Sequence, residues 1–220
     1  MAAKYVAIIT DGNGRWAASR DLPAVEGHSA GADVVKARLR DAVEFGIEEL
    51  TVYSFSTENW SRPAEEVTAL MRMFSQRIAT ETPELNDEGV RMRFIGRRER
   101  VTAALLEQMD WAEAETAAND RITLYVAFNY GGRAEVLDAA ARYTGGGEEA
   151  FQRLLYAPEM HDPDLIIRTS GEQRMSNYLL WQSAYSELVF ADELWPDFTR
   201  EAFERSLDEY AARGRRFGGR

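Results

Sequence analysis

Four polar segments hold the residues best suited to chemistry, and each follows a short apolar run. Three of them contain glycine, which lets a backbone come close to an anion. Their other residues are mostly acids, amides, hydroxyls and arginines. This combination is typical of phosphate and metal chemistry. The segments begin Asp11-Gly-Asn-Gly-Arg, Ser56-Thr-Glu-Asn-Trp, Asn129-Tyr-Gly-Gly-Arg and Thr169-Ser-Gly-Glu-Gln-Arg.

The first segment predicts an anion site. Gly12 and Gly14 lie between a strand and a helix, where free N–H groups at the helix start, together with Arg15, would hold a diphosphate. Asp11, at the strand tip, would then bind a magnesium ion that bridges to the same diphosphate. A plain glycine turn with a capping aspartate explains these residues equally well, because such turns are common.

The second segment, Ser54 to Pro63, crowds hydroxyls, an acid, an amide and Arg62 at one strand end, and Pro63 suits the start of a helix. Taken alone, Trp60 is better explained as a packing anchor.

A further segment supplies a second candidate anion site. Arg168 and Arg174 lie within seven residues of a glycine-containing loop, and with Ser176 they could clasp an anion bidentately. A surface arginine is usually only solvated. Two of them beside such a loop favour phosphate binding instead.

The spacing of apolar residues predicts the elements that position these segments. Apolar runs indicate strands, and patterns that return every three or four residues indicate helices. Because strand and helix alternate, we expect an α/β fold with a mostly parallel central sheet flanked by helices. The loops at the carboxyl ends of such strands gather on one edge, where ligands bind. The expected strands are Tyr5–Thr10, Glu49–Phe55, Val90–Ile95, Ile122–Phe128 and Leu165–Arg168, and the expected helices are Ala30–Phe45, Glu65–Thr80, Val101–Ala118 and Asp197–Tyr210, the last capped by Thr199.

Composition narrows the class of protein. With 220 residues and 45% hydrophobic content, we expect residues 1–220 to form a single domain. The absence of cysteine excludes thiol chemistry and disulfides and favours a cytoplasmic location. We find no signal peptide or membrane span, so any membrane contact would be peripheral. A net charge of −11 argues against nucleic acid as a partner.

The ordered motifs resemble those of the undecaprenyl diphosphate synthase family of cis-prenyltransferases. The resemblance runs from about Tyr5 to Gly219, and five motifs in the same order make chance agreement implausible. It implies an enzyme that joins isoprenyl diphosphates, with Mg²⁺ as the cofactor. The motifs are Asp-Gly-Asn-Gly-Arg-Trp-Ala, Phe-Ser-Thr-Glu-Asn-Trp-x-Arg-Pro, Asn-Tyr-Gly-Gly-Arg, Ile-Arg-Thr-Ser-Gly-Glu-Gln-Arg and a terminal Arg-Arg-Phe-Gly-Gly.

The resemblance also implies roles for single residues. Asp11 would hold magnesium, supported by Glu187, while Ser56 and Asn59 would act with Asp11 in catalysis by positioning the reacting double bond and the departing proton. The allylic diphosphate would be bound by Gly12, Gly14, Arg15 and His28, and the second diphosphate by Arg168, Arg174 and Ser176. The remaining motif residues expected to contact substrate are Asn13, Trp16, Phe55, Glu58, Trp60, Arg62 and Gly218.

The basic end, Arg216-Phe217-Gly218, resembles an element that completes the site of a neighbouring subunit, which implies a homodimer.

The growing product is apolar, so we expect a hydrophobic tunnel. Strand alternation predicts that Ser54 and Phe55 face opposite sides of the sheet, and the small Ser54 cannot block such a tunnel. A block would come from Met71, Met73 or Phe74. Candidate lining residues are Leu70, Phe74, Ile78, Ile95, Leu124 and Val126.

One departure from the family pattern keeps other readings open. Ala24 stands where relatives commonly carry an arginine that contacts diphosphate. A relaxed allylic site would suit irregular, head-to-middle condensation to a branched, lavandulyl-type product. A non-catalytic accessory subunit is a second alternative, although the retained Asp11, Arg15 and Arg168 argue against it. The third is a phosphate-binding α/β regulatory module, which would need neither metal ligands nor an apolar tunnel.

Overall fold

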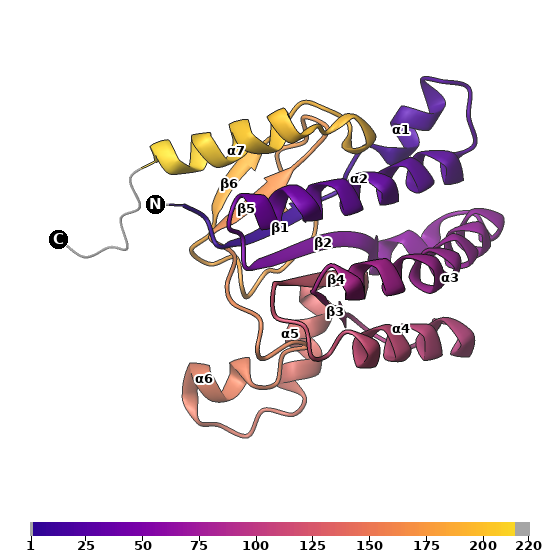
Figure 1. Cartoon of the computed structure of the whole chain (residues 1–220). Coiled ribbons are helices and arrows are strands. Elements are labelled where there is room, and N and C mark those ends of the chain that lie inside the picture. The colour runs from indigo at the N-terminus through magenta and orange to yellow at the C-terminus, as the bar shows by residue number, and fades with distance from the viewer. Residues whose placement is uncertain (1, 214–220) are drawn as a thin grey trace.

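A computed structural model describes residues 2–213 (Figure 1). Its centre is a six-stranded sheet with the order β3-β4-β2-β1-β5-β6, in which every neighbouring pair of strands is parallel. The expected single α/β domain is therefore confirmed. The strands are β1 (Tyr5–Ile9), β2 (Glu49–Ser56), β3 (Val90–Ile95), β4 (Ile122–Tyr130), β5 (Leu165–Arg168) and β6 (Glu187–Phe190).

The helices follow the strands in sequence and cover the sheet. Thr199 caps the last helix, as predicted, by accepting a hydrogen bond from the backbone of Ala202. No helix within residues 2–213 has the length and apolarity to cross a membrane. The helices are α1 (Asn13–Ala18), α2 (Ala24–Glu44), α3 (Ala64–Asp87), α4 (Ala103–Glu115), α5 (Gly132–Ala140), α6 (Gly147–Gln152) and α7 (Arg200–Ala212), with 3₁₀ turns at Thr57–Ser61 and Trp195–Asp197.

The two faces of the sheet bury two separate apolar clusters. The larger cluster joins β2 and β4 to α2, α3, α4 and α7, which lie on one side of the sheet (Figure 1). The smaller one packs the other face against the segments 156–160 and 175–179. Two-sided burial explains why the strands read as nearly continuous apolar runs in the sequence.

Strand β2 departs from the expected alternation. Tyr53 pairs with Ala127 and Phe55 with Phe128, so one extra residue, Ser54, is inserted into β2. Because of this bulge, Phe55 joins Val52 in the larger cluster instead of facing away from it. The prediction that Ser54 and Phe55 lie on opposite faces is therefore wrong.

Candidate active site

The carboxyl ends of β4, β2, β1 and β5 lie side by side in the sheet. These are the strands that the four polar segments follow, so the predicted gathering of those segments at one edge is confirmed. Hydrogen bonds also join the segments at this edge to one another. The Asp11 carbonyl accepts from the Thr169 hydroxyl (2.7 Å) and from the Trp195 N–H (2.9 Å).

Asp11 and Arg168 form the centre of the site. Arg168 Nη2 donates to Asp11 Oδ2 at 2.7 Å, and the guanidinium is buried, with 4% of its side chain exposed. Burial alone would raise the pKa of Asp11, but the hydrogen bond and charge of Arg168, with smaller contributions from Ser170 and Arg15, hold that pKa below its usual value. Asp11 is therefore a carboxylate at neutral pH.

Arg168 is fixed from its other side by the loop that follows β5. Its Nη1 donates to Ser176 Oγ and to the Arg174 carbonyl, both at 2.5 Å. Arg168 Nε is buried and has no hydrogen-bond partner among the described residues. The arginine is thus held in place from both sides.

Arg15 and Arg174 bring two further cations to this loop. Arg15 Nη2 donates to Ser170 Oγ at 2.5 Å and lies 3.6 Å from Asp11 Oδ1. Both arginines also pair with Glu172, and about half or more of each side chain is exposed. With Arg168, the loops at β1 and β5 therefore carry three guanidinium groups beside two carboxylates, Asp11 and Glu172, which leaves an excess of positive charge.

The segment after β2 is connected to the same loop. Asn177 Nδ2 donates to Glu58 Oε1 at 2.8 Å. Ser56 and Asn59 form a reciprocal capping box, in which the Ser56 N–H donates to Asn59 Oδ1 at 3.0 Å. Ser56 and Asn59, two of the three predicted catalytic residues, thus each hold the other's backbone, and the neighbouring Glu58 connects this segment to the Arg168 loop.

Trp60 packs between neighbours, as the simpler reading of its role suggests. Its ring meets Phe55 edge to face (centroids 5.0 Å apart) and lies beneath the Arg100 guanidinium. Trp60 Nε1 donates to Asn129 Oδ1 at 2.7 Å. Phe55 is buried behind Phe128, with which it stacks, and does not line the pocket described below.

His28 and Arg62 meet between the starts of α2 and α3. His28 Nε2 lies 3.1 Å from Arg62 Nη1, and Arg62 also pairs with Glu66. Burial, and then the nearby charge of Arg62, lower the pKa of His28 to about 4. His28 is therefore neutral at pH 7 and can offer a hydrogen bond to a substrate, but no positive charge.

The Gly27-His28-x-x-Gly31 motif has a packing role besides the histidine. A Cβ added at Gly27 would lie 2.1 Å from the Asn13 carbonyl oxygen, and one at Gly31 would lie 2.3 Å from Asn13 Oδ1. Both positions therefore require glycine so that α2 can press onto Asn13. This contact fixes His28 beside the loop after β1.

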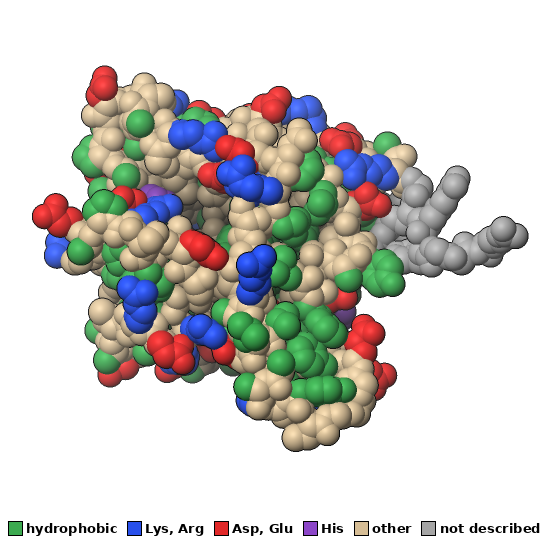
Figure 2. All heavy atoms as spheres, turned by 180° about the vertical axis from the view of Figure 1, so that it is seen from behind, with side chains coloured by type: hydrophobic (Ala, Val, Ile, Leu, Met, Phe, Trp, Pro, Cys, Tyr) green, Lys and Arg blue, Asp and Glu red, His purple; other side chains and the backbone are tan. Residues whose placement is uncertain are grey.

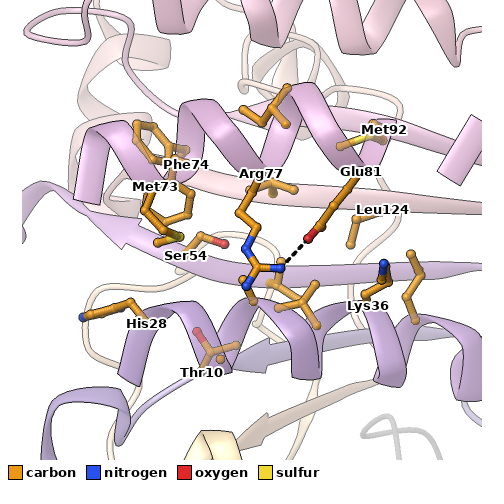
Figure 3. A pocket seen from close by; sticks show the side chains of 18 of the residues that line it. Thr10, His28, Lys36, Ser54, Met73, Phe74, Arg77, Glu81, Met92 and Leu124 are labelled. Atoms are coloured by element: carbon orange, nitrogen blue, oxygen red, sulfur yellow. Dashed lines mark hydrogen bonds and ion pairs between the residues drawn. The ribbon is translucent and has the colours of Figure 1, made fainter. Parts of the chain in front are cut away.

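An apolar pocket opens beside these residues, between the sheet and helices α2 and α3 (Figure 3). Thr10, Asn13 and His28 lie at the end nearest the site. Four of the six residues expected to line a tunnel line this pocket, but Leu70 does not, and Ile95 lies on the opposite face of the sheet. The other lining residues include Ser54, Phe74, Ile78, Leu85, Met92, Leu124, Val126 and Phe128.

Glu187 lies at the other edge of the sheet from Asp11. It opens β6 opposite Leu165, at the amino end of the strands, and its Oε2 accepts a hydrogen bond from Arg213 at 2.9 Å. The structure does not bring Glu187 and Asp11 together within one chain. Strand register explains the mismatch, because Asp11 follows β1 whereas Glu187 begins β6. The metal-binding role of Glu187 stays a prediction.

The remaining predicted residues take varied places. Gly12 caps α1 with φ of 111°, and Gly14 is exposed. Trp16 points outward, where its Nε1 donates to Asp197 at 2.8 Å. Gly218 and the basic tail lie outside the described residues. His161, the second histidine of the chain, lies beside the start of β2, with Nδ1 2.7 Å from Glu49 Oε1.

Several residues of the site were given no individual role from the sequence. Ser170 holds Arg15, Asn177 holds Glu58 and Asn129 holds Trp60. Each has a positive φ (79°, 63° and 50°), a conformation that is uncommon for residues other than glycine. The available signal was their position: each lies inside or beside a polar segment that follows a strand.

Comparison with known proteins agrees with the fold. The family described as "Putative undecaprenyl diphosphate synthase" matches residues 9–218. An "Isoprenyl transferase" of Thermotoga maritima is 51% identical, with 98% of this chain and 97% of the relative covered. "Isoprenyl transferase 1" of Streptomyces coelicolor is 47% identical, with 100% and 83% covered.

Two solved structures share the fold over nearly their whole length. The lavandulyl diphosphate synthase of Lavandula x intermedia, solved with dimethylallyl diphosphate, has a TM-score of 0.94 at 32% identity, with 99% of each chain covered. A "probable undecaprenyl diphosphate synthase" of Campylobacter jejuni has a TM-score of 0.86 at 29% identity, with 100% of each chain covered. The fold and the sequence relatives together define a prenyltransferase enzyme. The chain belongs to the undecaprenyl diphosphate synthase family.

Proposed function

We propose that this enzyme condenses an allylic diphosphate with isopentenyl diphosphate to give a (Z)-polyprenyl diphosphate in a magnesium-dependent reaction. One observation carries the proposal: the ion-paired Asp11, Arg15 and Arg168 adjoin Thr10 and Asn13, which line one end of an apolar pocket. A diphosphate joined to a hydrocarbon chain matches this arrangement, because its charged end suits the arginines and its tail suits the pocket.

The charge pattern supports ionisation of the allylic substrate. When the allylic C–O bond breaks, the electron pair leaves with the diphosphate, and positive charge develops on carbon. Arg15 and the free N–H groups at the start of α1 would stabilise the leaving diphosphate. His28, neutral and beside Arg62, would donate one further hydrogen bond.

The second substrate would then attack. The double bond of isopentenyl diphosphate forms the new C–C bond at the allylic carbon, and loss of a proton creates the next double bond. Arg168 and Arg174 would hold its diphosphate, aided by Ser176, while Ser56 and Asn59 would orient the reacting end. Holding two substrates in line lowers the barrier by removing the entropy cost of their encounter.

The residues present fit a magnesium ion that is shared with substrate. Within residues 2–213, no three acidic or histidine side chains are grouped to hold a metal. Asp11 Oδ2 is taken by Arg168, but Oδ1 has no nitrogen of Arg15 closer than 3.6 Å. Magnesium is often bound by one or two carboxylates plus substrate phosphates, and when bound here it would neutralise charge on the diphosphate.

We further propose that the enzyme acts as a homodimer. Exposed apolar side chains gather on the side of the molecule that carries α5 and α6 (Figure 2). Leu137 is 66% exposed and Tyr185 is 72% exposed, and Tyr143 and Leu180 are also exposed. Such surfaces usually mark contacts between proteins. A cytoplasmic location also stays a prediction.

The second candidate function is irregular condensation to a branched product. Ala24 and the similarity to a lavandulyl diphosphate synthase favour it. The isoprenyl transferases at 47% and 51% identity favour the regular reaction, and so does the apolar pocket, whose lining extends along α3 from Met73 to Leu85.

Product identification tests both candidates. Purified protein would be incubated with magnesium, isopentenyl diphosphate and either dimethylallyl, geranyl or farnesyl diphosphate, and the products compared with authentic standards by chromatography and mass. Linear products longer than the primer are expected. A branched product from dimethylallyl diphosphate alone would favour the irregular reaction, and no prenyl product with any primer would overturn both.

A further inference from the structure

The outer wall of the apolar pocket is built from ion pairs that join α2 to α3. Arg77 Nη1 lies 2.5 Å from Asp33 Oδ1, Lys36 Nζ lies 2.8 Å from Glu84 Oε2, and Arg40 Nη2 lies 2.6 Å from Glu84 Oε1. Arg77 and Lys36 line the pocket, whereas Arg40 does not. The two helices are thus bridged by long charged side chains over an apolar space.

Among these bridges, Arg77 combines several hydrogen bonds with a place in the pocket lining. Its Nη1 also donates to Glu81 Oε1 at 2.8 Å, and its Nη2 donates to Ser29 Oγ at 2.9 Å and to the Ser29 carbonyl at 3.0 Å. Both terminal nitrogens are used, on α2 and on its own helix. Figure 3 shows the side chain extending from α3 toward α2, with β2 behind it. We call this tethered side chain the Arg77 strap.

The strap lies partway along the pocket. Both helices begin near the active-site edge, so higher residue numbers along each helix lie deeper. Met73 and Phe74 line the pocket on the site side of Arg77, and Ile78 and Leu85 line it on the far side. An alkyl chain that enters beside His28 therefore has to pass the strap, or push it aside, to use the deeper space.

We propose that Arg77 is a specificity-determining residue that limits the length of the hydrocarbon chain the pocket accepts, an inference that rests on the proposed function. An alkyl chain offers no hydrogen bond or charge in exchange for those it would displace. Moving the guanidinium would leave a partly buried Arg77 and Glu81 without their partners, which is unfavourable. The ion-paired strap therefore opposes further elongation more strongly than apolar side chains of similar size would.

The test compares product length in two variants that each lose an interhelical arginine. Arg77→Ala removes the strap, and Arg40→Ala removes a bridge between the same helices outside the pocket. With a fixed primer, Arg77→Ala should lengthen the main product by at least one isoprene unit, and Arg40→Ala should match wild type. Equal distributions in Arg77→Ala and wild type, or an equal shift in both variants, would overturn the proposal.

Asp33→Ala provides a second variant in case Arg77→Ala does not fold. Asp33 is 65% exposed, so its loss removes one of the two α2 residues that hold the strap, the other being Ser29, without opening the core. A smaller shift in the same direction is expected, and an unchanged distribution would count against the strap.

A binding measurement separates this inference from the proposed function. For a series of n-alkyl phosphates of increasing length, affinity should rise with each methylene until the chain reaches the strap, and Arg77→Ala should move that plateau to longer chains. If wild type makes no prenyl product, the proposed function is wrong and this series alone decides the role of Arg77. An unmoved plateau would refute the strap even in an active enzyme.

Discussion

Arg168 and Asp11 are joined by a 2.7 Å hydrogen bond between side chains that lie 157 positions apart in the chain. The pair connects the loops after β5 and β1, and it holds Asp11 ionised while leaving the two other arginines of the cluster more exposed. A carboxylate that is kept charged by a buried arginine can serve both as an anchor of the site and as a metal ligand.

Replacing Asp11 should abolish activity more than it harms the fold. We expect Asp11→Asn to lower turnover by several orders of magnitude, because the group proposed to hold the metal at the leaving diphosphate loses its charge. The amide oxygen can still accept from Arg168, so the fold should remain. Asp11→Ala should lose as much activity and, by leaving Arg168 unpaired, more stability. Steady-state kinetics and thermal unfolding measure the two effects; wild-type turnover in either folded variant would contradict the metal assignment.

Stability should fall as the pH is lowered, because His28 resists protonation in the folded state. Its pKa is about 4 when folded and about 6.5 when unfolded, so the unfolded chain binds more protons between these values. The stabilisation from neutral His28 is complete above about pH 6.5 and is lost as the pH falls toward 4. The shift corresponds to about 3 kcal/mol.

The control for this pH effect is His28→Gln. Urea unfolding at pH 7 and at about pH 4.5 would be compared in wild type and variant. The decrease in the free energy of unfolding should be smaller in His28→Gln, because other groups titrate equally in both proteins. An identical decrease would mean that His28 is not held neutral by burial and Arg62.

The arrangement of the sheet could be predicted from the sequence, whereas the contacts that shape the apolar pocket could not. Alternation of strand and helix predicted the parallel sheet, and parallel strands bring their carboxyl-end loops together, so the grouping of Asp11 with Arg168 followed. Strand β6 was missed because it has four residues and begins with a charge. The bulge at Ser54 and the Arg77 strap depend on contacts between distant elements, which no local pattern encodes.

Because residue 24 is alanine, we expect the enzyme to lack one guanidinium contact to the diphosphate of the primer. Arg20, a candidate to replace that guanidinium, is already engaged, because it lies over the Trp16 ring and 3.4 Å from Asp197. A charge-assisted hydrogen bond contributes about 1.5 to 3 kcal/mol, so Ala24→Arg should tighten farnesyl diphosphate binding by about ten- to a hundredfold. Arg20→Ala should leave the affinity unchanged. Calorimetric titration measures both, and a flat or weaker affinity in Ala24→Arg would mean that the site is built around alanine.

Removing residues 215–220 should weaken use of the second substrate. The tail lies outside the described residues, and its basic Arg-Arg-Phe-Gly-Gly sequence is predicted to complete the site of a partner subunit. We expect KM for isopentenyl diphosphate to rise more than KM for the allylic primer, since a phosphate contact would be lost. Sedimentation should show a dimer for both the full and the shortened chain. A monomeric full-length protein, or unchanged kinetics, would contradict this role.

Enlarging Ser54 should shorten the product. Ser54 lines the apolar pocket beside Phe74 and Phe128, on the site side of Arg77, and its small side chain leaves that part of the pocket open. A leucine there would fill space that the growing chain needs, so Ser54→Leu should shift products toward fewer isoprene units, whereas wild type should extend farnesyl diphosphate beyond fifteen carbons.

Phe55→Leu is the matched control, because Phe55 is on the same side of the sheet but packs behind Phe128 outside the pocket. Reversed-phase chromatography of the products measures the shift. Wild-type products of only ten or fifteen carbons, with no change in Ser54→Leu, would show that the pocket does not set product length and would favour a single, irregular condensation.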